Sequence, residues 1–445
     1  MDFFDLGLFS VYSWLLIFFA LKFRDWAIKP TSVLYKVLVP GLIFKIVGSF
    51  AFALAYTFYF PYGDSFNYFD GAVALSNALI KDPVAWWQIM SAAPFEHTPR
   101  TMPYLHFGYA HGATTFIICK LASIPCLLGA QQFFTTTLLF SVISYSGTIA
   151  FVVVFTKLYP QIKYALGWAL ICIPSVVFWG SGILKDTVTY ACLGWLLWGL
   201  YSLFKAKKRF VLPVIVIVVC SYLLIIIKVY IFLIFLPFAI LWLVQSFISR
   251  FFKKNDRLVV TPALLILSII IIAGSSYFIT KKLNISTDSV KWAVGAMQYV
   301  HNADEFSSSG SRSGYDLGDY SSSVVAFITT IPKAINVSLF RPYLWEVNSP
   351  AIVLSAIESL LLLIFTVVCL VRLGISRFFR MMVSSKNLKF FLFFALSFAF
   401  VVGFISYNFG ALTRYKIPLL PFYMVFLVCL YYGVDLKGKI NQQHN

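Results

Sequence analysis

Charged residues are scarce in this chain of 445 residues: they make up 12% of it, whereas 60% of the residues are hydrophobic. A soluble domain keeps roughly a quarter of its residues charged, so this chain cannot cover a water-facing surface of its size. No basic segment precedes the first apolar stretch, which follows Met1-Asp-Phe-Phe-Asp5. We therefore expect that stretch to be a retained membrane span and not a cleaved signal.

Metal-ligand patterns, internal repeats, low-complexity tails and soluble domains are also lacking. The seven cysteines lie singly in apolar stretches, which favours buried core residues over disulfides or zinc ligands. A net charge of +18 would suit nucleic acid. The basic residues fall in short clusters between apolar runs, however, which is the pattern of a membrane protein. We expect no nucleic-acid partner.

Twelve apolar runs are long enough to cross a bilayer, which takes about 20 residues per helix. They cover residues 6–21, 35–59, 107–128, 133–156, 164–180, 188–204, 210–227, 229–249, 259–279, 350–371, 390–407 and 417–434. The prediction is an all-α, polytopic integral membrane protein with about 11–13 transmembrane helices. Residues 1–445 would form a single transmembrane domain.

Basic clusters predict the orientation. Four clusters and the C-terminal pair carry 19 positive charges against three acids; they are Lys22/Arg24/Lys29/Lys36, Lys205/Lys207/Lys208/Arg209, Arg250/Lys253/Lys254/Arg257, Arg372/Arg377/Arg380/Lys386/Lys389 and Lys437/Lys439. The other long loops, 60–106, 181–187, 280–349 and 408–416, carry 11 charges of each sign. The positive-inside rule therefore places the basic clusters in the cytoplasm and the other loops outside.

Between residues 107 and 163, the number of apolar runs disagrees with the number of membrane crossings that the orientation requires. An odd number must lie between 107 and 163, with Lys157 and Lys163 inside, but hydropathy shows two apolar runs there. We expect the stretch that contains Pro125, or the segment His106–His111 before it, to be re-entrant or split into an extra crossing.

Two outer loops are substantial. Residues 60–106 contain Trp86, Trp87 and Met90 close to Lys81 and Asp82, which predicts a juxtamembrane amphipathic helix with its tryptophans at the headgroups. Residues 280–349 include the Ser- and Gly-rich run 306–323, whose composition is typical of a lid or of a loop that orders on binding.

The first polar motif follows the second span and contains Asp64 and Ser65 after Gly63. A carboxylate at this place can act as a general base toward a sugar or lipid hydroxyl, or hold a divalent cation, with Ser65 beside it to bind substrate. The alternative is that Asp64 and Ser65 cap the following helix. His97, close to Glu96 and Arg100 in the same loop, is a candidate to assist.

A second motif places Lys185 and Asp186 between two spans, after two glycines. Charges beside hydrocarbon are usually paired or functional. Lys185 would bind a phosphate, and Asp186 would orient it or serve as a second carboxylate. The alternative is an interfacial pair that ends a helix.

The two remaining motifs lie late in the chain. Arg341 can bind phosphate oxygens, and Trp345 can hold a sugar ring or a prenyl chain; alternatively, Glu346 pairs with Arg341 in an aromatic belt. Arg414 and Lys416 are cations on the predicted outer side, against the positive-inside trend. A lipid-linked phosphate would be a suitable anionic partner for them.

The order of these motifs resembles that of the GT-C superfamily of membrane glycosyltransferases. It comprises a carboxylate soon after an early span, a long first loop that ends in Pro103-Tyr-Leu-His-Phe-Gly108, an outer Lys-Asp and a late Arg414-Tyr-Lys-Ile-Pro418. It is most similar to the bacterial branch of protein mannosyltransferases and aminoarabinose transferases. The resemblance covers most of the chain in architecture and short motifs in sequence. Many relatives have two adjacent acids where Asp64 is followed by Ser65 here.

The resemblance implies an inverting glycosyltransferase that takes a sugar from a polyprenyl-phosphate or polyprenyl-diphosphate carrier. Asp64 and Asp186 would be the catalytic acids, and Arg414 and Lys416 would bind the carrier phosphate. The acceptor would be a glycan, lipid or protein at the outer face of a bacterial inner membrane, and a divalent cation is a candidate cofactor. The alternatives are an envelope-polysaccharide polymerase or ligase, a transporter or flippase, and a non-catalytic membrane subunit.

Overall fold

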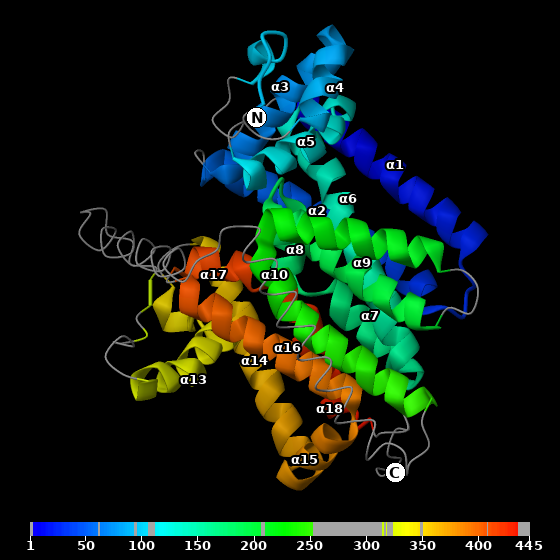
Figure 1. The fold of residues 1–445 in the computed structure, drawn as a ribbon, viewed down its shortest axis with the longest axis vertical. Coiled ribbons are helices and arrows are strands. Elements are labelled where there is room, and N and C mark those ends of the chain that lie inside the picture. Colours follow the sequence, from blue (N-terminus) through cyan, green and yellow to red (C-terminus); the bar gives the residue numbers. More distant parts are fainter. Residues whose placement is uncertain are drawn as a thin grey trace. The chain divides into compact units, whose positions relative to one another are not determined.

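The computed structural model describes residues 3–60, 63–92, 96–105, 112–205, 210–251, 314–315, 317, 324–347, 350–406 and 408–434. Within these residues every regular element is a helix, apart from one bridge between Gly314 and Asn408 (Figure 1). The chain divides into two compact units, Met1–Val229 and Tyr230–Asn445. The predicted all-α class is therefore confirmed for the described residues.

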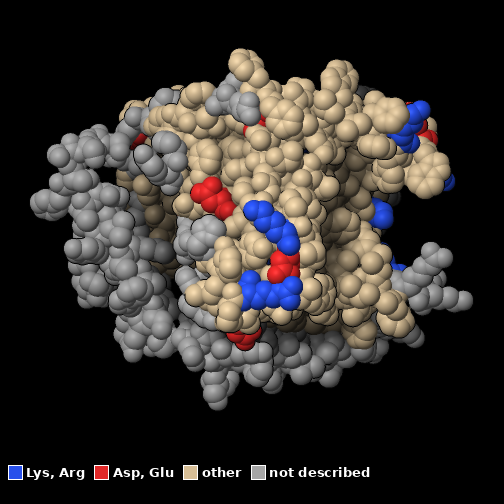
Figure 2. Space-filling model, turned by 90° about the horizontal axis from the view of Figure 1, so that it is seen from above, with Lys and Arg blue, Asp and Glu red and all other residues tan. Residues whose placement is uncertain are grey.

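Eight helices in the described part of the chain are long and apolar enough to cross a membrane, or nine if a bent pair forms one further span. The face drawn in Figure 2 is mostly uncharged, with one group of acidic and basic side chains near its centre and others at its edge. An integral membrane protein is thereby supported. The predicted run 259–279 lies outside the described residues.

The first unit is built from the helices that precede Tyr230. They are α1 (Phe3–Ala27), α2 (Val33–Phe58), α3 (Asp64–Lys81), α4 (Pro83–Ser91), α5 (Ala113–Leu128), α6 (Phe133–Leu158), α7 (Lys163–Ile171), α8 (Pro174–Phe178), α9 (Lys185–Lys205) and the start of α10 (Val211–Phe251). Helices α3, α4 and α5 lie together at one end of the unit (Figure 1). The helix predicted in the first outer loop is present as α4, with Trp87 exposed.

Small residues let α6 and α9 approach each other closely. A Cβ atom on Gly147 would lie 2.4 Å from the Cα of Ala191, and one on Gly194 would lie 2.5 Å from the carbonyl oxygen of Gly147. Lipid supplies no hydrophobic drive between helices, so membrane helices associate through close packing of this kind. The two glycines therefore set the distance between these candidate spans.

Asp5 on α1 caps the start of α6, 129 residues later in the chain. Its buried carboxylate accepts hydrogen bonds from the backbone N–H of Phe134 at 2.8 Å and of Thr135 at 3.0 Å, and from the Thr135 hydroxyl at 2.9 Å. The N-cap residue itself, Gln132, makes no side-chain cap. Asp5 therefore supplies from another helix the acceptor that α6 lacks, and places the starts of α1 and α6 at the same end of the unit.

We expect Asp5→Ala to lower the free energy of unfolding by about 1–2 kcal/mol, because the first N–H groups of α6 lose their acceptor. The measurement is reversible unfolding of the full chain in mixed detergent micelles. Asp5→Asn is the matched control: it retains one acceptor oxygen and should lose less than Asp5→Ala. Equal stability of Asp5→Ala and wild type would show that water replaces the carboxylate without cost.

The opposite end of the unit collects basic residues. The Lys163 ammonium donates to the carbonyl of Thr31 at 3.1 Å, and Lys36 lies 4.4 Å from the centre of the Tyr164 ring. The first basic cluster and Lys163 therefore share one end, as the charge pattern predicted.

Helix α5, which contains Pro125, has 16 residues. At 1.5 Å per residue it extends about 24 Å, less than the hydrocarbon thickness of about 30 Å, so of these two helices only α6 is a candidate span.

Two predicted spans contain breaks. The run 164–180 is a bent pair of helical segments, Pro160–Ile171 and Pro174–Ser181, at 57° to each other. The runs 210–227 and 229–249 are the two helical halves of α10, which meet at a kink where Lys228 has a non-helical backbone (φ −147°, ψ 79°). The predicted boundary between the two runs is thus confirmed as a break, with no separate loop between them.

The second unit contains the helices that follow Val229. After the end of α10 they are α13 (Val324–Phe340), α14 (Pro350–Leu373), α15 (Ile375–Ser384), α16 (Lys386–Ile405), α17 (Phe409–Tyr415) and α18 (Leu420–Tyr431). Phe235, Phe394 and Phe422 are buried and in mutual ring contact, with centroids 4.6–6.2 Å apart. This aromatic core joins α10, α16 and α18.

Helix α13 lies within the predicted outer loop 280–349, for which the sequence had predicted no helix. It packs closely on α16, because a Cβ atom on Gly403 would lie 2.1 Å from the carbonyl oxygen of Ala334 and the Ser338 hydroxyl donates to the carbonyl of Ala399 at 2.6 Å. Pro332 and Lys333 interrupt its apolar run, and for this reason hydropathy alone did not reveal it. The predicted lid at 306–323 lies almost wholly outside the described residues.

Candidate functional site

In the first unit, the candidate site begins where α3 starts. Gly63 occupies the N-cap position without a side-chain cap, so Asp64 is the first residue inside the helix. An acid in this turn is favoured by the helix dipole, and the Asp64 side chain remains partly exposed. The neighbouring Ser65 is fully buried, and its hydroxyl has no hydrogen-bond partner within the described structure.

Aromatic side chains join the turn before α3 to the turn before α9. The rings of Phe60 and Trp179 lie 6.4 Å apart. Gly63 lies against the ring of Tyr56, which is stacked on Phe52 at 4.4 Å, and a Cβ atom on Gly182 would fall within that Phe52 ring. The two helix starts therefore belong to one end of the first unit. We call Asp64, Ser65, Lys185 and Asp186 the helix-start cluster.

Lys185 and Asp186 occupy the first turn of α9 in different surroundings. Lys185 is partly exposed and donates to the Thr114 hydroxyl at 3.1 Å. Asp186 is buried, and its carboxylate lies 2.6 Å from the ammonium of Lys228 at the break in α10. A carboxylate held in an ion pair inside the protein suits a positioning role better than proton transfer.

Two ionisable residues near the helix-start cluster were not predicted as site residues. Lys228 stood at the junction of two apolar runs, and its partner Asp186 is 42 positions away, so no local pattern joins them. Asp70 lies on α3 after Asp64, and partial burial raises the pKa of its carboxyl. Both Asp70 and Lys185 lie within electrostatic reach of Cys119 on α5. Asp70 was visible in the sequence only as a further acid of the same motif.

Arg341, Trp345 and Glu346 of the second unit form a local arrangement. The Arg341 guanidinium binds the Glu346 carboxylate through Nε, at 3.0 Å to both oxygens, and through Nη2. This is the alternative pairing that the sequence left open. Trp345 is 82% exposed and stacked on Tyr343 at 4.8 Å, so it offers an open aromatic face to a ligand or to lipid.

Lys416 is fully buried, in contrast to the exposed position expected of a phosphate ligand. Its ammonium donates to the Ser359 hydroxyl at 3.1 Å and lies 3.6 Å from the carboxylate of Glu358. Glu358 and Ser359 belong to α14, and the Ser359 hydroxyl in turn donates to the carbonyl of Arg341 at 2.9 Å. Arg414, two residues earlier, stays partly exposed.

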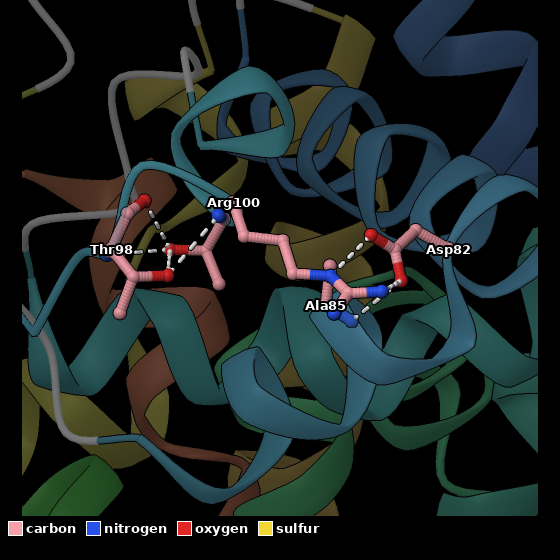
Figure 3. A network of polar contacts seen from close by, with 5 residues as sticks. Asp82, Ala85, Thr98 and Arg100 are labelled. Atoms are coloured by element: carbon pink, nitrogen blue, oxygen red, sulfur yellow. Dashed lines mark hydrogen bonds and ion pairs between the residues drawn. The ribbon is translucent and has the colours of Figure 1, made fainter.

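A compact turn directly follows His97 in the first outer loop; Figure 3 shows Thr98 and Arg100 of this turn together with Asp82 and Ala85. The Arg100 guanidinium donates to both carboxylate oxygens of Asp82, each at 2.6 Å, and Asp82 also accepts from the backbone N–H of Ala85 at 3.1 Å. Thr98 and Thr101 close the turn with mutual hydrogen bonds. Asp82 thus caps α4 and anchors the segment that carries His97.

The hydrogen bonds from Arg100, and then that from Ala85, lower the pKa of Asp82 to about 2. A carboxyl with a lowered folded-state pKa contributes stability that is complete above its unfolded pKa, about 3.9, and is lost as the pH falls through the folded value. We expect the protection factors of the backbone amides in residues 83–92 and 96–101 to stay constant from pH 7 to 5, where the Asp82–Arg100 pair is intact, and to fall between pH 4 and 2. Arg100→Gln should exchange faster already at pH 7; equal protection in both proteins would contradict this role.

A divalent cation was a predicted cofactor. Among the described residues, no group of three or more His, Cys, Asp and Glu could hold a metal ion. Asp64 and Asp186 do not supply such a set, since Asp186 is bound to Lys228. The segment His106–His111, predicted to be re-entrant or part of an extra crossing, lies outside the described residues.

All seven cysteines are free, and every one except Cys172 is buried. The interpretation of the cysteines as small core residues is thus confirmed for six of them.

No protein-family model, curated protein sequence or solved structure matches the chain.

Proposed function

We propose that the chain is an inverting glycosyltransferase of the GT-C type, which transfers a sugar from a polyprenyl-phosphate donor to an acceptor at the outer membrane face. The observation that carries this proposal is the meeting of two helix starts in the first unit. One starts with a partly exposed carboxylate, Asp64, and the other with a partly exposed ammonium, Lys185. Inverting transfer from a lipid phosphate requires a base for the acceptor and positive charge for the departing phosphate.

In the proposed reaction, the Asp64 carboxylate removes the proton of the acceptor hydroxyl. The acceptor oxygen forms a bond to the anomeric carbon, while the bond from that carbon to the phosphate oxygen breaks on the opposite face. The electron pair leaves with polyprenyl phosphate. Lys185 and the N-terminal amides of α9 would stabilise this phosphate, because helix N-termini favour anions. No step requires a metal ion.

The remaining predicted site residues take supporting roles. Asp186, bound to Lys228, is a positioning residue that holds the start of α9. Ser65 offers a buried hydroxyl next to the base, and His97 is an assisting residue of the same loop. Arg341, Trp345 and Arg414 belong to the second unit, and their roles as ligands of the carrier or the sugar stay predictions from the sequence. Lys416 would act by holding Glu358.

The test is a transfer assay with the full chain in liposomes. Short-chain polyprenyl-phosphate hexoses and aminopentoses, radiolabelled in the sugar, are supplied with an extract of envelope glycans and lipids as acceptors. We expect release of polyprenyl phosphate and a product with inverted anomeric configuration. Consumption of a polyprenyl-diphosphate oligosaccharide alone would favour the polymerase or ligase. Consumption of neither donor would overturn the proposal.

A transporter is a second candidate, because one observation favours it. Lys45 lies midway along α2, is buried, and donates to the carbonyl of Val176 in the bent pair at 2.6 Å. Buried cations beside broken helices are typical of substrate or ion paths in membrane transporters. Movement of labelled polyprenyl-phosphate sugar between leaflets of protein-containing liposomes, without chemical transfer, would support this candidate over the enzyme.

A further inference from the structure

Helix α15 (Ile375–Ser384) differs from the other helices of the second unit in its position. It joins two candidate spans, α14 and α16, and packs on both. Gly374 separates it from α14 with a φ of +76°, a backbone conformation that glycine adopts without strain. A ten-residue helix that connects the end of one span to the start of the next must lie at the edge of the hydrocarbon layer.

Three faces of α15 have different surroundings. Met381 is buried, and Phe378 contacts the Phe426 ring of α18 at 6.5 Å, so this face packs on the protein. Ile375, Phe379 and Val383, spaced four residues apart, are 78%, 61% and 75% exposed. Residues at this spacing share one side of a helix, so they form a second, unpacked apolar face, which we call the outer apolar face.

The third face is basic. Arg377 and Arg380 alternate in sequence with the apolar residues of the helix. Both side chains are exposed, and they project from its polar side. Three further cations flank the helix, and the segment 371–390 contains no acid; the flanking cations are Arg372, Lys386 and Lys389. A helix with a wide apolar face and a basic polar face is the usual form of a segment that lies in a lipid headgroup layer.

The outer apolar face also continues a surface of α14. Val367 and Val371 are 50% and 78% exposed on that candidate span, and an apolar surface on a span faces lipid. Val371 lies two residues before the end of α14, and Ile375 begins α15 directly after Gly374. The exposed apolar residues of α15 therefore follow an apolar surface of α14 along the chain, at the place where the positive charges gather.

We propose that α15 is an anionic-lipid binding element, which inserts Ile375, Phe379 and Val383 among the acyl chains and binds the phosphates of acidic phospholipids through Arg377 and Arg380. The inference does not depend on glycosyl transfer. It makes the second unit sensitive to the charge of the leaflet that faces the basic clusters, which is predicted to be the cytoplasmic one.

Spin labels test the insertion. Cys172, the only exposed cysteine, is replaced by Ser, and single labels are attached to Phe379→Cys and Arg377→Cys in the full chain in liposomes. The label at 379 should be accessible to oxygen and shielded from a water-soluble nickel chelate, and the label at 377 should show the reverse. Equal access of the chelate to both labels would overturn the proposal. Shielding of residue 379 from both reagents would assign the face to a second copy or another protein.

Lipid affinity tests the proposed binding of acidic phospholipids by Arg377 and Arg380. Binding of phosphatidylglycerol to the full chain in detergent is measured by native mass spectrometry, with phosphatidylcholine as the neutral comparison. Each cation at a membrane surface contributes about fivefold in affinity, so Arg377→Gln/Arg380→Gln should weaken phosphatidylglycerol binding about 25-fold. Lys22→Gln/Lys29→Gln removes the same charge from α1 and its following turn, and should weaken it less than threefold. Equal losses in the two double variants would show a general charge effect and overturn the assignment to α15.

Discussion

Asp64→Asn should reduce the rate of sugar transfer by about 10²–10⁴-fold, which is the usual contribution of a positioned general base. Asparagine keeps the size of the side chain and its place in the first turn of α3, but it cannot accept the proton of the acceptor hydroxyl. Binding of the donor should change little, so the loss should appear in kcat and not in KM. The measurement is the liposome transfer assay with saturating donor.

Asp70→Asn is the matched control for this prediction, because it removes an acid of the same helix six residues later. Since burial raises the pKa of Asp70, this carboxyl is the competing base. We expect Asp70→Asn to retain transfer within about tenfold of wild type. A large loss in Asp70→Asn with normal activity in Asp64→Asn would move the base to Asp70. Normal activity in both variants would remove general-base catalysis by α3 from the proposal.

Lys228→Met should lower the free energy of unfolding by about 3–5 kcal/mol, the usual cost of breaking a buried ion pair from one side. Asp186 is 2% exposed and lies 2.6 Å from the Lys228 ammonium. Without that ammonium its charge would remain in a medium that solvates it poorly, or the carboxyl would have to bind a proton. Reversible unfolding in mixed detergent micelles measures the loss.

The double variant Asp186→Asn/Lys228→Met distinguishes loss of the Asp186–Lys228 ion pair from other effects of a substitution at the break in α10. It removes both charges, so it should recover a large part of the stability lost in Lys228→Met. Lys185→Met, at the neighbouring and partly exposed cation, should cost less than about 1 kcal/mol. If the double variant is as unstable as the sum of the single variants, the two side chains do not interact energetically, and Asp186 is not held by Lys228.

Local features were predictable along the chain, since each depends on few neighbouring residues. The limits of α2, α6, α9 and α14 follow from apolar runs bounded by polar residues, and the break at Lys228 lies where two runs meet. The pairing of Arg341 with Glu346 was foreseen as an alternative because the two are five positions apart. Helix α13 was missed, because Pro332 and Lys333 weaken its apolar pattern while contacts with α16 stabilise the helix.

The partners of the buried charges could not be predicted in the same way. Asp5 binds the start of α6, Asp186 binds Lys228, and Lys416 binds Glu358, at separations of 129, 42 and 58 positions. Many cations and hydrogen-bond donors were available to these acids in the sequence, and only the path of the chain selects the partner. The candidate site changed accordingly: Asp64 and Lys185 are partly exposed, and Lys185 donates to Thr114, whereas Asp186 and Lys416 are buried against charged partners.

The amino-acid sequence by itself determined that this is a helical membrane protein and where most of its candidate spans begin and end. Transfer of a segment into lipid depends on the composition of about 20 consecutive residues, and lipid then obliges the backbone to form helices. The tertiary structure alone decided which ionisable groups are paired, which are open, and that α15 has an uncovered apolar face. Those properties depend on atoms that the fold brings within a few ångströms from distant parts of the chain.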